Sequence, residues 1–340
     1  MSDEDIRGAT GLAAQWGLIT RRQALDSGHS PQQVRTRAGP RGPWISVRRG
    51  VYAVRERWDA ASDSERALMA DVAAHLSMRL PHALSHDSAA RAMDLPLLRP
   101  MRPLIHVTRQ GVLGTRTEWG VKHHLGRESP AQINDLDGVL VTGLARTSLD
   151  LAREHGFPAG VVAIDAARRR GATPREYEHE LARMKHWPFV TVARRALHFS
   201  DPGAESPAES LGRILVDELG LGEVQSQFAV RLGDRTVWCD LRVGCHVFEV
   251  DGRVKYRRVE DGGLAEDPSE VIWAEKLRER DICSVGLGMS RIVWSDFWGE
   301  QRDLAIARLR REYALTRQRF GDRLPEHLER FARSHPRSVR

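Results

Sequence analysis

The amino-acid sequence predicts a multidomain α+β protein. Its 340 residues suit two or three domains, and its hydrophobic content of 41% is enough for ordinary hydrophobic cores. The N-terminal stretch has the pattern of short capped helices followed by two short strands, and residues 200–299 follow the order helix, three strands, helix, strand. The predicted parts are a head at 6–56, a mixed α/β region at 60–199, the segment at 200–299, and a basic helical tail at 300–340.

The composition excludes several classes of protein. The sequence has no run of 18 apolar residues, so it predicts no membrane span. Its acidic, polar start at residues 2–5 is unlike a signal peptide. The three cysteines, Cys239, Cys245 and Cys283, fit neither a disulfide framework nor a zinc-ligand spacing. We therefore expect a soluble, reduced, cytoplasmic protein with no membrane partner.

Charge is distributed unevenly along the chain, which has a net charge of +6 and a pI near 9.6. Residues 6–55 hold nine Arg and one Asp, a net +8, and residues 300–340 hold eleven Arg and six acids, a net +5. Residues 200–298 hold twelve Lys or Arg and nineteen acids, a net −7. A basic head and tail suit a polyanion such as nucleic acid. The alternative explanation is an arginine-rich composition that reflects a GC-rich genome.

The basic head has the signals of a winged helix-turn-helix. We expect a first helix that ends at Trp16 and Leu18, a second helix capped by Thr20, and a third helix over Pro31–Ala38 capped by Ser30. Two short strands about a basic turn would form the wing. In this motif one helix enters the major groove and wing arginines reach phosphate or the minor groove; the alternative is a winged helix that contacts protein. The predicted DNA contacts are Gln32, Arg35, Arg37, Arg48 and Arg49.

The central region contains histidines that raise the question of a metal site. His82 and His86 are spaced i, i+4 on a predicted helix start, and His123 and His124 are adjacent on a predicted strand. A metal site needs more ligands than one such pair. Because no third ligand lies near either pair in the sequence, we favour structural histidines here.

Two charged stretches are predicted to lie at the surface. Asp165 and Arg168–Arg170 have the pattern of a solvated helix end. Residues 302–340 predict a helix that carries Leu304, Leu309 and Tyr313, followed by an arginine-rich end. This tail either packs on the preceding domain or is partly disordered.

The segment Val237–Tyr256, VWCDLRVGCHVFEVDGRVKY, has the pattern of two strands joined at Gly244–Cys245. A two-residue turn there places Asp240 directly opposite Glu249, and Asp251 follows Glu249 on the same face of its strand. Like charges opposite each other destabilise a sheet, whereas a hard divalent cation binds such carboxylates. The sequence therefore predicts a site for Mg²⁺ or Mn²⁺.

Two known families resemble parts of this chain. In the head and central region, GLITRRQALDSGHSPQQVRTRAG, WISVRRGVYAV, PHALSHDSAA, VLVTGLARTSLDLA and VVAIDAARRRG resemble AbiEi-type antitoxins. Further on, SPAESLGRILVDELGL, WCDLRV, FEVDGRVKY and WAEKLRERD…MSRIVWSDFW resemble PD-(D/E)XK restriction endonucleases, in particular the branch akin to very-short-patch-repair endonucleases. The second resemblance implies a restriction-endonuclease-like α-β-β-β-α-β domain at 200–299.

That resemblance also implies metal-dependent hydrolysis of DNA phosphodiester bonds. The implied metal ligands are Asp240, Glu249 and Asp251. The implied catalytic residues are Glu209, Asp240, Glu249, Asp251, Lys255 and Lys276. The chain departs from the family because the lysine normally stands two residues after the glutamate, where this sequence has Asp251. Lys255 or Lys276 would have to take that role.

Several of these residues also have structural explanations. Glu209 is the third helical residue after Ser206 and would complete a capping box. Lys276 lies in a charged pattern that is typical of an exposed helix face, and Lys255 would serve equally as a solvated loop lysine. The opposed pair of Asp240 and Glu249 has the strongest functional implication.

These observations predict a Mg²⁺-dependent endonuclease that acts on double-stranded DNA, with defence against foreign DNA as the setting that the resemblance implies. The alternative from another class is a non-catalytic AbiEi-like antitoxin or transcriptional repressor that binds operator DNA and a toxin partner. A repair enzyme that nicks mismatched DNA is a third alternative. One active site cuts one strand, so double-strand cleavage would require a homodimer or two sequential nicks.

Overall fold

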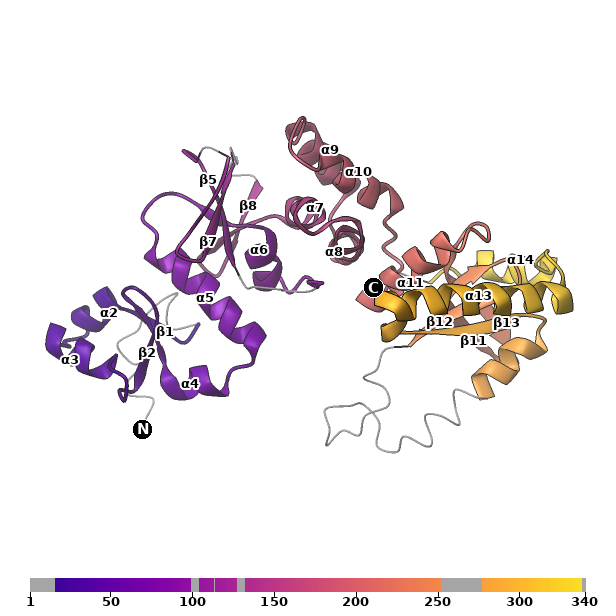
Figure 1. Ribbon diagram of the computed structural model, residues 1–340, viewed down its shortest axis with the longest axis horizontal. Helices are drawn as coiled ribbons and strands as arrows, with labels where there is room; N and C mark the ends of the chain where they lie inside the picture. Colours follow the sequence, from indigo (N-terminus) through magenta and orange to yellow (C-terminus); the bar gives the residue numbers. More distant parts are fainter. Residues whose placement is uncertain (1–15, 99–103, 113, 127–131, 252–276, 338–340) are drawn as a thin grey trace. The chain divides into compact units, whose positions relative to one another are not determined.

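A computed structural model describes residues 16–98, 104–112, 114–126, 132–251 and 277–337 (Figure 1). The chain divides into two compact units. Unit 1 comprises Met1–Ala163 and Ala172–Arg195, and unit 2 comprises Ile164–Gly171 and Ala196–Arg340. The described residues contain helices and three separate sheets, so the predicted α+β, multidomain character is confirmed. No helix in this described part is long and apolar enough to cross a membrane.

Unit 1 begins with two short helices and a three-stranded sheet of order β1-β3-β2. Thr20 and Ser30 cap the two helices through the predicted capping boxes. The predicted end of a first helix is wrong, because Leu18 lies in a strand that pairs with β3 after a left-handed turn at Gly17 (φ 67°). The elements are β1 Leu18–Thr20, α2 Arg21–Asp26, α3 Pro31–Arg37, β2 Trp44–Arg48 and β3 Val51–Val54.

A six-stranded mixed sheet of order β6-β7-β5-β4-β9-β8 forms the centre of unit 1. Strands β5 and β7 run parallel to each other, and β4 pairs antiparallel with β5 and parallel with β9. The fully buried side chains of Leu84, Val107 and Val141 anchor three of these strands in the core. The strands are β4 Ala83–Leu84, β5 Ile105–Arg109, β6 Thr115–Glu118, β7 Val121–Leu125, β8 Ile133–Leu136 and β9 Val139–Thr142.

Seven helices, α4 to α10, lie between residues 55 and 199 of the described chain, and α6 packs against both β5 and α7. The short strand β4 ends one residue before Ser85, which precedes α6, so the start of α6 is held at the edge of β5. The helices are α4 Arg55–Ala60, α5 Asp63–Ser77, α6 His86–Ala92, α7 Leu144–His155, α8 Phe157–Arg169, α9 Pro174–Arg183 and α10 Val190–Phe199.

The predicted solvated helix end at Asp165 and Arg168–Arg170 is wrong. Asp165 is 1% exposed and accepts hydrogen bonds from Ser210 Oγ (2.8 Å), Arg213 Nη2 (2.8 Å) and the backbone NH of Asp201 (2.7 Å). Arg168 Nη1 donates to the carbonyl oxygen of Ser200 (2.7 Å). These partners lie far along the chain, so a local pattern could not reveal them. The end of α8 is therefore part of the buried polar core of unit 2.

A four-stranded sheet of order β10-β11-β12-β13 forms the core of unit 2. Strands β10, β11 and β12 are antiparallel neighbours, whereas β12 and β13 run parallel. The order of the elements is the predicted one. They are α11 Pro207–Glu218, β10 Gln225–Leu232, β11 Arg235–Val243, β12 His246–Asp251, helical residues 277–284, and β13 Gly288–Val293.

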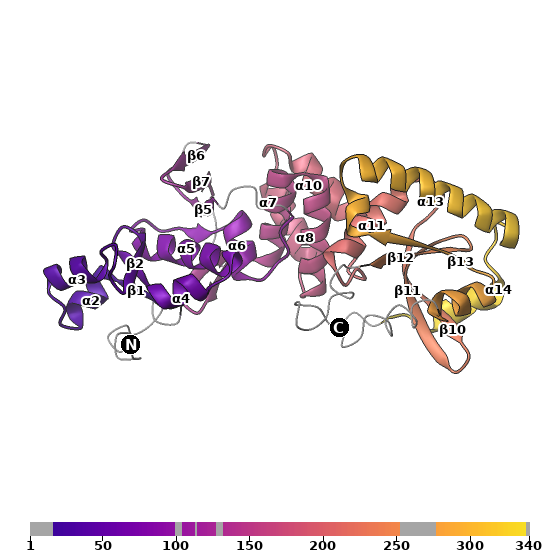
Figure 2. The same cartoon turned by 60° about the horizontal axis from the view of Figure 1, so that its bottom comes forward.

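The basic tail packs on this sheet over its described length. After the 3-10 turn η5 (Trp294–Phe297), α13 (Gly299–Phe320) lies along β13 and α14 (Glu326–Ser334) lies against β10 (Figure 2). Leu309 and Tyr313 of α13 are buried, whereas Leu304 of the same helix is 62% exposed. Leu328 of α14 joins the same hydrophobic cluster as the core residues of β10. The described tail is thus a structural part of unit 2.

Candidate functional site

The hairpin between β11 and β12 has the predicted register and the predicted turn at Gly244–Cys245. Three cross-strand pairs define it: Leu241 with Phe248, Arg242 with Val247, and Val243 with His246. Gly244 takes a positive φ of 55°, which a glycine adopts without strain. The backbone pairing stops at Leu241, and the backbone NH of Val250 donates instead to Asp240 Oδ2 (2.8 Å). The acidic residues therefore begin where the two strands separate.

Asp240 interacts electrostatically with Glu209 of α11. Burial raises the pKa of the Glu209 carboxyl, the hydrogen bond from the backbone NH of Glu205 opposes this, and the negative charge of Asp240 raises the pKa further. Glu209 Oε2 also accepts a hydrogen bond from Gln227 Nε2 (3.1 Å). A nearby cation would relieve the repulsion between the two carboxylates.

Glu209 also helps to begin α11. Ser206 Oγ accepts from the backbone NH of Glu209 (3.2 Å) and donates to Glu209 Oε1 (2.9 Å). The other carboxylate oxygen, Oε2, accepts from the backbone NH of Glu205 (2.8 Å). A capping box would require the backbone NH of Ser206 as the donor, so the predicted box is not formed in full. The structural explanation of Glu209 is thus supported, and its electrostatic interaction with Asp240 accompanies it.

Glu249 is contacted by an arginine that the sequence did not indicate. Arg278 Nη2 donates to Glu249 Oε1 (3.1 Å) and to the carbonyl oxygen of Trp238 (2.8 Å). Cys239 lies beside this pair: burial raises the pKa of its thiol, and the negative charge of Glu249 raises it further. Arg278 therefore joins β12 to β11 at the acidic end of the hairpin.

Asp251 is contacted by a second arginine. Its side chain is 9% exposed, and Asp251 Oδ2 lies 3.7 Å from Arg291 Nη1 of β13. Arg291 stands level with Glu249 in the parallel pairing of β12 and β13. The three predicted metal ligands are therefore contacted by three different groups: the NH of Val250, Arg278 and Arg291. Lys255 and Lys276 lie outside the described residues.

A cavity of about 570 Å³ opens next to the residues that hold Glu209. Its lining includes Glu205 and Gln227 together with Arg169, Arg333 and Arg337. Arg337 donates to Gln227 Oε1 (2.5 Å) and to Glu205 Oε2 (2.8 Å). Arginines in such a position suit the phosphate groups of a ligand.

The predicted DNA-contacting residues of the head differ in exposure. Gln32, Arg35 and Arg49 are exposed, and Gln32 Oε1 accepts from Arg35 Nη2 (2.7 Å). Arg37 is half-buried over the ring of Trp44, with its guanidinium carbon 5.4 Å from the ring centroid.

Arg48 is half-buried as well, and burial lowers the pKa of its guanidinium. Its Nη2 donates to the carbonyl oxygen of Trp119 (3.1 Å), which ties the strand end to the β6–β7 turn. Arg35 and Arg49 are therefore the predicted arginines whose side chains are exposed to a ligand.

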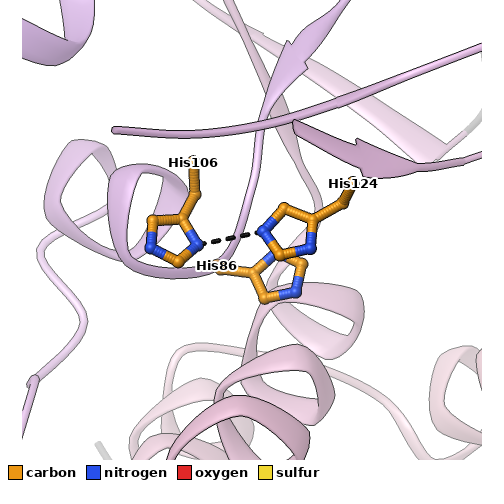
Figure 3. A group of neighbouring side chains, drawn as sticks. All are labelled: His86, His106 and His124. Atoms are coloured by element: carbon orange, nitrogen blue, oxygen red, sulfur yellow. Dashed lines mark hydrogen bonds between the residues drawn. The ribbon is translucent and has the colours of Figure 1, made fainter. Parts of the chain in front are cut away.

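Unit 1 contains a cluster of three histidines that the sequence did not predict. His86 begins α6, His106 lies in β5 and His124 lies in β7, and their rings face one another (Figure 3). One nitrogen from each ring can be chosen so that all three lie within 4.8 Å of one another. Among the described residues, no other three His, Cys, Asp or Glu side chains are so arranged, and the carboxylates of Asp240, Glu249 and Asp251 therefore do not form such a group.

The sequence analysis considered two other pairs, His82 with His86 and His123 with His124, and His82 and His123 have different contacts in the structure. His82 Nε2 lies 3.0 Å from His75 Nδ1, and His123 Nδ1 accepts from Arg109 Nε (3.2 Å). A third histidine lies near in space although it is distant in the sequence: His106 lies beside His86 and His124, whereas His82 and His123 lie outside this cluster.

The three rings are packed closely and shielded from water. The rings of His86 and His124 are stacked with centroids 3.7 Å apart, and His106 Nδ1 lies 3.1 Å from His124 Nε2. The exposures are 3% for His86, 3% for His106 and 8% for His124. Burial lowers the pKa of His106 and of His124 to about 4 and that of His86 well below its ordinary value. The rings are therefore neutral at physiological pH.

Comparison with known proteins gives a partial relationship. Two curated proteins of Mycobacterium tuberculosis, uncharacterized protein MT2308 and uncharacterized protein Rv2248, are each 29% identical to this chain over 109 residues. The matched segment covers 32% of this chain and 40% of each relative, so the chain spans less than half the length of the curated relatives it matches. No family model matches the chain.

Proposed function

We propose that this chain is a DNA-binding protein that hydrolyses phosphodiester bonds with Mg²⁺ at the acidic end of the β11–β12 hairpin. The observation that carries the proposal is the hairpin register, which brings Asp240 and Glu249 to the point where two neighbouring strands separate. Carboxylates on adjacent strands, beside a helix that contributes Glu209, are the arrangement that the resemblance to very-short-patch-repair endonucleases implies.

The donor set suits a hard cation. Asp240, Glu249 and Asp251 offer carboxylate oxygens, which Mg²⁺ and Mn²⁺ prefer to nitrogen or sulfur. Burial raises the pKa of Glu209 and the negative charge of Asp240 raises it further; a bound cation would offset this repulsion. When bound there, Mg²⁺ would lower the pKa of an attacking water and stabilise the charge of the phosphoryl group.

The side chains of this chain have distinct proposed roles. Asp240 and Glu249 would bind the ion, Asp251 would bind it or orient water, and Glu209 would bind a second ion or position the site. Arg278 contacts Glu249 and would bind the scissile phosphate, as an arginine does through two parallel hydrogen bonds. It would then supply the positive charge that the family's lysine supplies.

The head would hold the DNA. Its two capped helices and the β2–β3 hairpin, with Arg35 and Arg49 exposed, have the composition of a winged helix-turn-helix that contacts a duplex. Separately, the arginine-lined cavity beside Glu205 in unit 2 would accept phosphate groups.

One observation favours a second function. Glu249 and Asp251 are each paired with an arginine, Arg278 and Arg291, which neutralise part of the charge that would attract a metal. A protein with such paired acids could bind operator DNA as an AbiEi-like repressor or antitoxin without cutting it. The two functions differ in whether a phosphodiester bond is broken.

A cleavage assay separates the two. Purified protein is incubated with supercoiled and linear DNA in Mg²⁺ or Mn²⁺, beside Asp240→Asn, Glu249→Gln and the control Asp303→Asn, an exposed acid of α13. We expect cleavage by the wild type and the control, and a loss of at least roughly a hundredfold in the two site variants, as for other groups that stabilise a transition state. Retention of promoter DNA without cutting under either metal would establish the repressor instead.

A further inference from the structure

We propose that His86, His106 and His124 form a binding site for a divalent transition-metal ion of the zinc class. This site lies in unit 1 and is independent of the hydrolytic function proposed above for unit 2. It would bind its ion through imidazole nitrogens, whereas the carboxylates of unit 2 would bind theirs through oxygen. The two proposals therefore concern different metals and can fail separately.

The distances within the cluster suit one ion. A zinc–nitrogen bond is about 2.0–2.1 Å, so two nitrogens of a tetrahedral site lie roughly 3.3 Å apart. His106 Nδ1 and His124 Nε2 are 3.1 Å apart, and the three candidate nitrogens all lie within 4.8 Å of one another. His86 lies stacked on His124 (Figure 3), so its ring would have to leave this stack to direct a nitrogen at the same ion.

The backbone holds these rings in place. The backbone NH of Ser85 donates to the carbonyl oxygen of His106 (3.0 Å), and the backbone NH of His106 donates to Ser88 Oγ (2.8 Å). These two bonds fix the start of α6, where His86 stands, against β5. His124 is positioned by the parallel pairing of β7 with β5. Such support from rigid elements is what a metal site requires of its surroundings.

His86 adopts a costly backbone conformation to take its position. Its φ is 47°, in the left-handed region that a non-glycine residue rarely occupies. Three buried imidazoles also cost more free energy than apolar side chains of similar size would. A shared metal ion gives a reason for both features, because it would bind the nitrogens in the neutral form that burial maintains.

Charged groups of both signs surround the cluster. Asp150 Oδ1 lies 3.8 Å from His86 Nε2, and the same carboxylate is paired with Arg146 (2.6 Å) and Arg153 (2.6 Å). Glu180 lies 3.8 Å from Arg146, and Asp87 is paired with His155 (2.6 Å). A carboxylate next to a metal-binding histidine commonly orients the ring, and Asp150 is placed for this role.

The test uses the full-length protein, stripped of metal with a chelator and titrated with Co²⁺ as a coloured substitute for Zn²⁺. We expect the visible absorption of tetrahedrally coordinated Co²⁺, its loss when Zn²⁺ is added, and a rise in the melting temperature of unit 1 with Zn²⁺ but not with Mg²⁺. Absence of the absorption and of the melting shift in the wild type would overturn the proposal. This result does not depend on any variant.

Variants then locate the ion. His106→Asn and His124→Asn are expected to weaken Co²⁺ binding at least about tenfold, which is the least that disturbing a metal site costs. The matched control is His123→Asn, which neighbours His124 on β7 but contacts Arg109, and it should keep wild-type binding. Asp240→Asn should also keep it, since that residue belongs to unit 2. Equal binding by wild type and by a folded His106→Asn protein, judged by its circular dichroism, would show that the ion lies elsewhere.

Discussion

Arg278 Nη2 lies 3.1 Å from Glu249 Oε1 and 2.8 Å from the carbonyl oxygen of Trp238. A single guanidinium nitrogen thus joins β12 to β11 just beyond the last paired residues of the hairpin. The guanidinium carries the charge that a metal ion would otherwise bring to Glu249. In the proposed function, Arg278 would compete with the ion for Glu249 and would bind phosphate.

The first prediction concerns Arg278→Gln. Removal of the guanidinium should strengthen Mn²⁺ binding a fewfold, because Glu249 loses a competing cation, and should reduce DNA cleavage, because the phosphate loses a donor. Isothermal titration with Mn²⁺ and single-turnover cleavage measure the two effects. Arg280→Gln, an exposed arginine two residues further on, serves as control. Weaker Mn²⁺ binding in Arg278→Gln would show that Arg278 helps to build the site rather than competing for it.

The second prediction concerns the buried ion pair of Asp165 and Arg213. Asp165→Ala should lower the free energy of unfolding of unit 2 by roughly 3–5 kcal/mol, because it leaves the guanidinium of Arg213 buried without its carboxylate. Urea unfolding followed at amides of β12 by hydrogen exchange would measure the change. The control is Glu326→Gln, which breaks an exposed pair with Arg330 and should cost at most about 1 kcal/mol. A comparable loss in both variants would refute the distinction.

Much of the secondary structure could be predicted because its signals are local. The caps at Thr20 and Ser30 are set by residues three positions apart, and the β11–β12 register is set by one two-residue turn. The predicted first helix was extended to Leu18 because the apolar pattern at Trp16 and Leu18 suits a helix as well as a strand. Leu18 lies in a strand because it pairs with β3, a contact that the local pattern does not reveal.

The side chains that complete each site could not be predicted, because sequence patterns carry no information on distant neighbours. His106 lies on a strand that was expected, but its proximity to His124 follows from the parallel pairing of β5 and β7. Arg278 and Arg291 reach the acids from a helix and a strand that lie further along the sequence. The alternation of side chains along β5 gives the face on which His106 lies. It does not reveal that β7, with His124, is the neighbouring strand.

The third prediction concerns DNA binding by the head. Arg35→Ala and Arg49→Ala should each weaken binding to duplex DNA and reduce the slope of log K against log salt by about one, since each exposed guanidinium would neutralise one phosphate. Fluorescence anisotropy at several salt concentrations gives the slope. Arg175→Ala, an exposed arginine of α9, is the matched control. An unchanged slope in both head variants would mean that this part of the chain contacts protein.

The last prediction concerns His246, a buried histidine of β12. Its Nδ1 lies 2.7 Å from Thr316 Oγ1 of α13, and its Nε2 lies 2.8 Å from Ser290 Oγ of β13. Ser290 Oγ donates its proton to Glu312 Oε2 (2.5 Å), so it must accept from His246 Nε2–H. The neutral ring is satisfied when Thr316 Oγ1 donates to Nδ1 in place of its longer bond to the carbonyl oxygen of Glu312 (3.3 Å). Burial lowers the pKa of His246 to about 4.

The consequence is a loss of stability in acid. Because the pKa in the folded state is below the value of 6.5 for an exposed histidine, the stabilisation is fully present above pH 6.5 and is lost as the pH falls towards 4. The shift corresponds to roughly 3 kcal/mol for unit 2. His246→Gln, which does not titrate, should therefore show a shallower decline in this range when hydrogen exchange of β12 and β13 is followed. The control is His198→Gln, an exposed histidine of the same unit, and equal slopes for both variants would contradict the assignment.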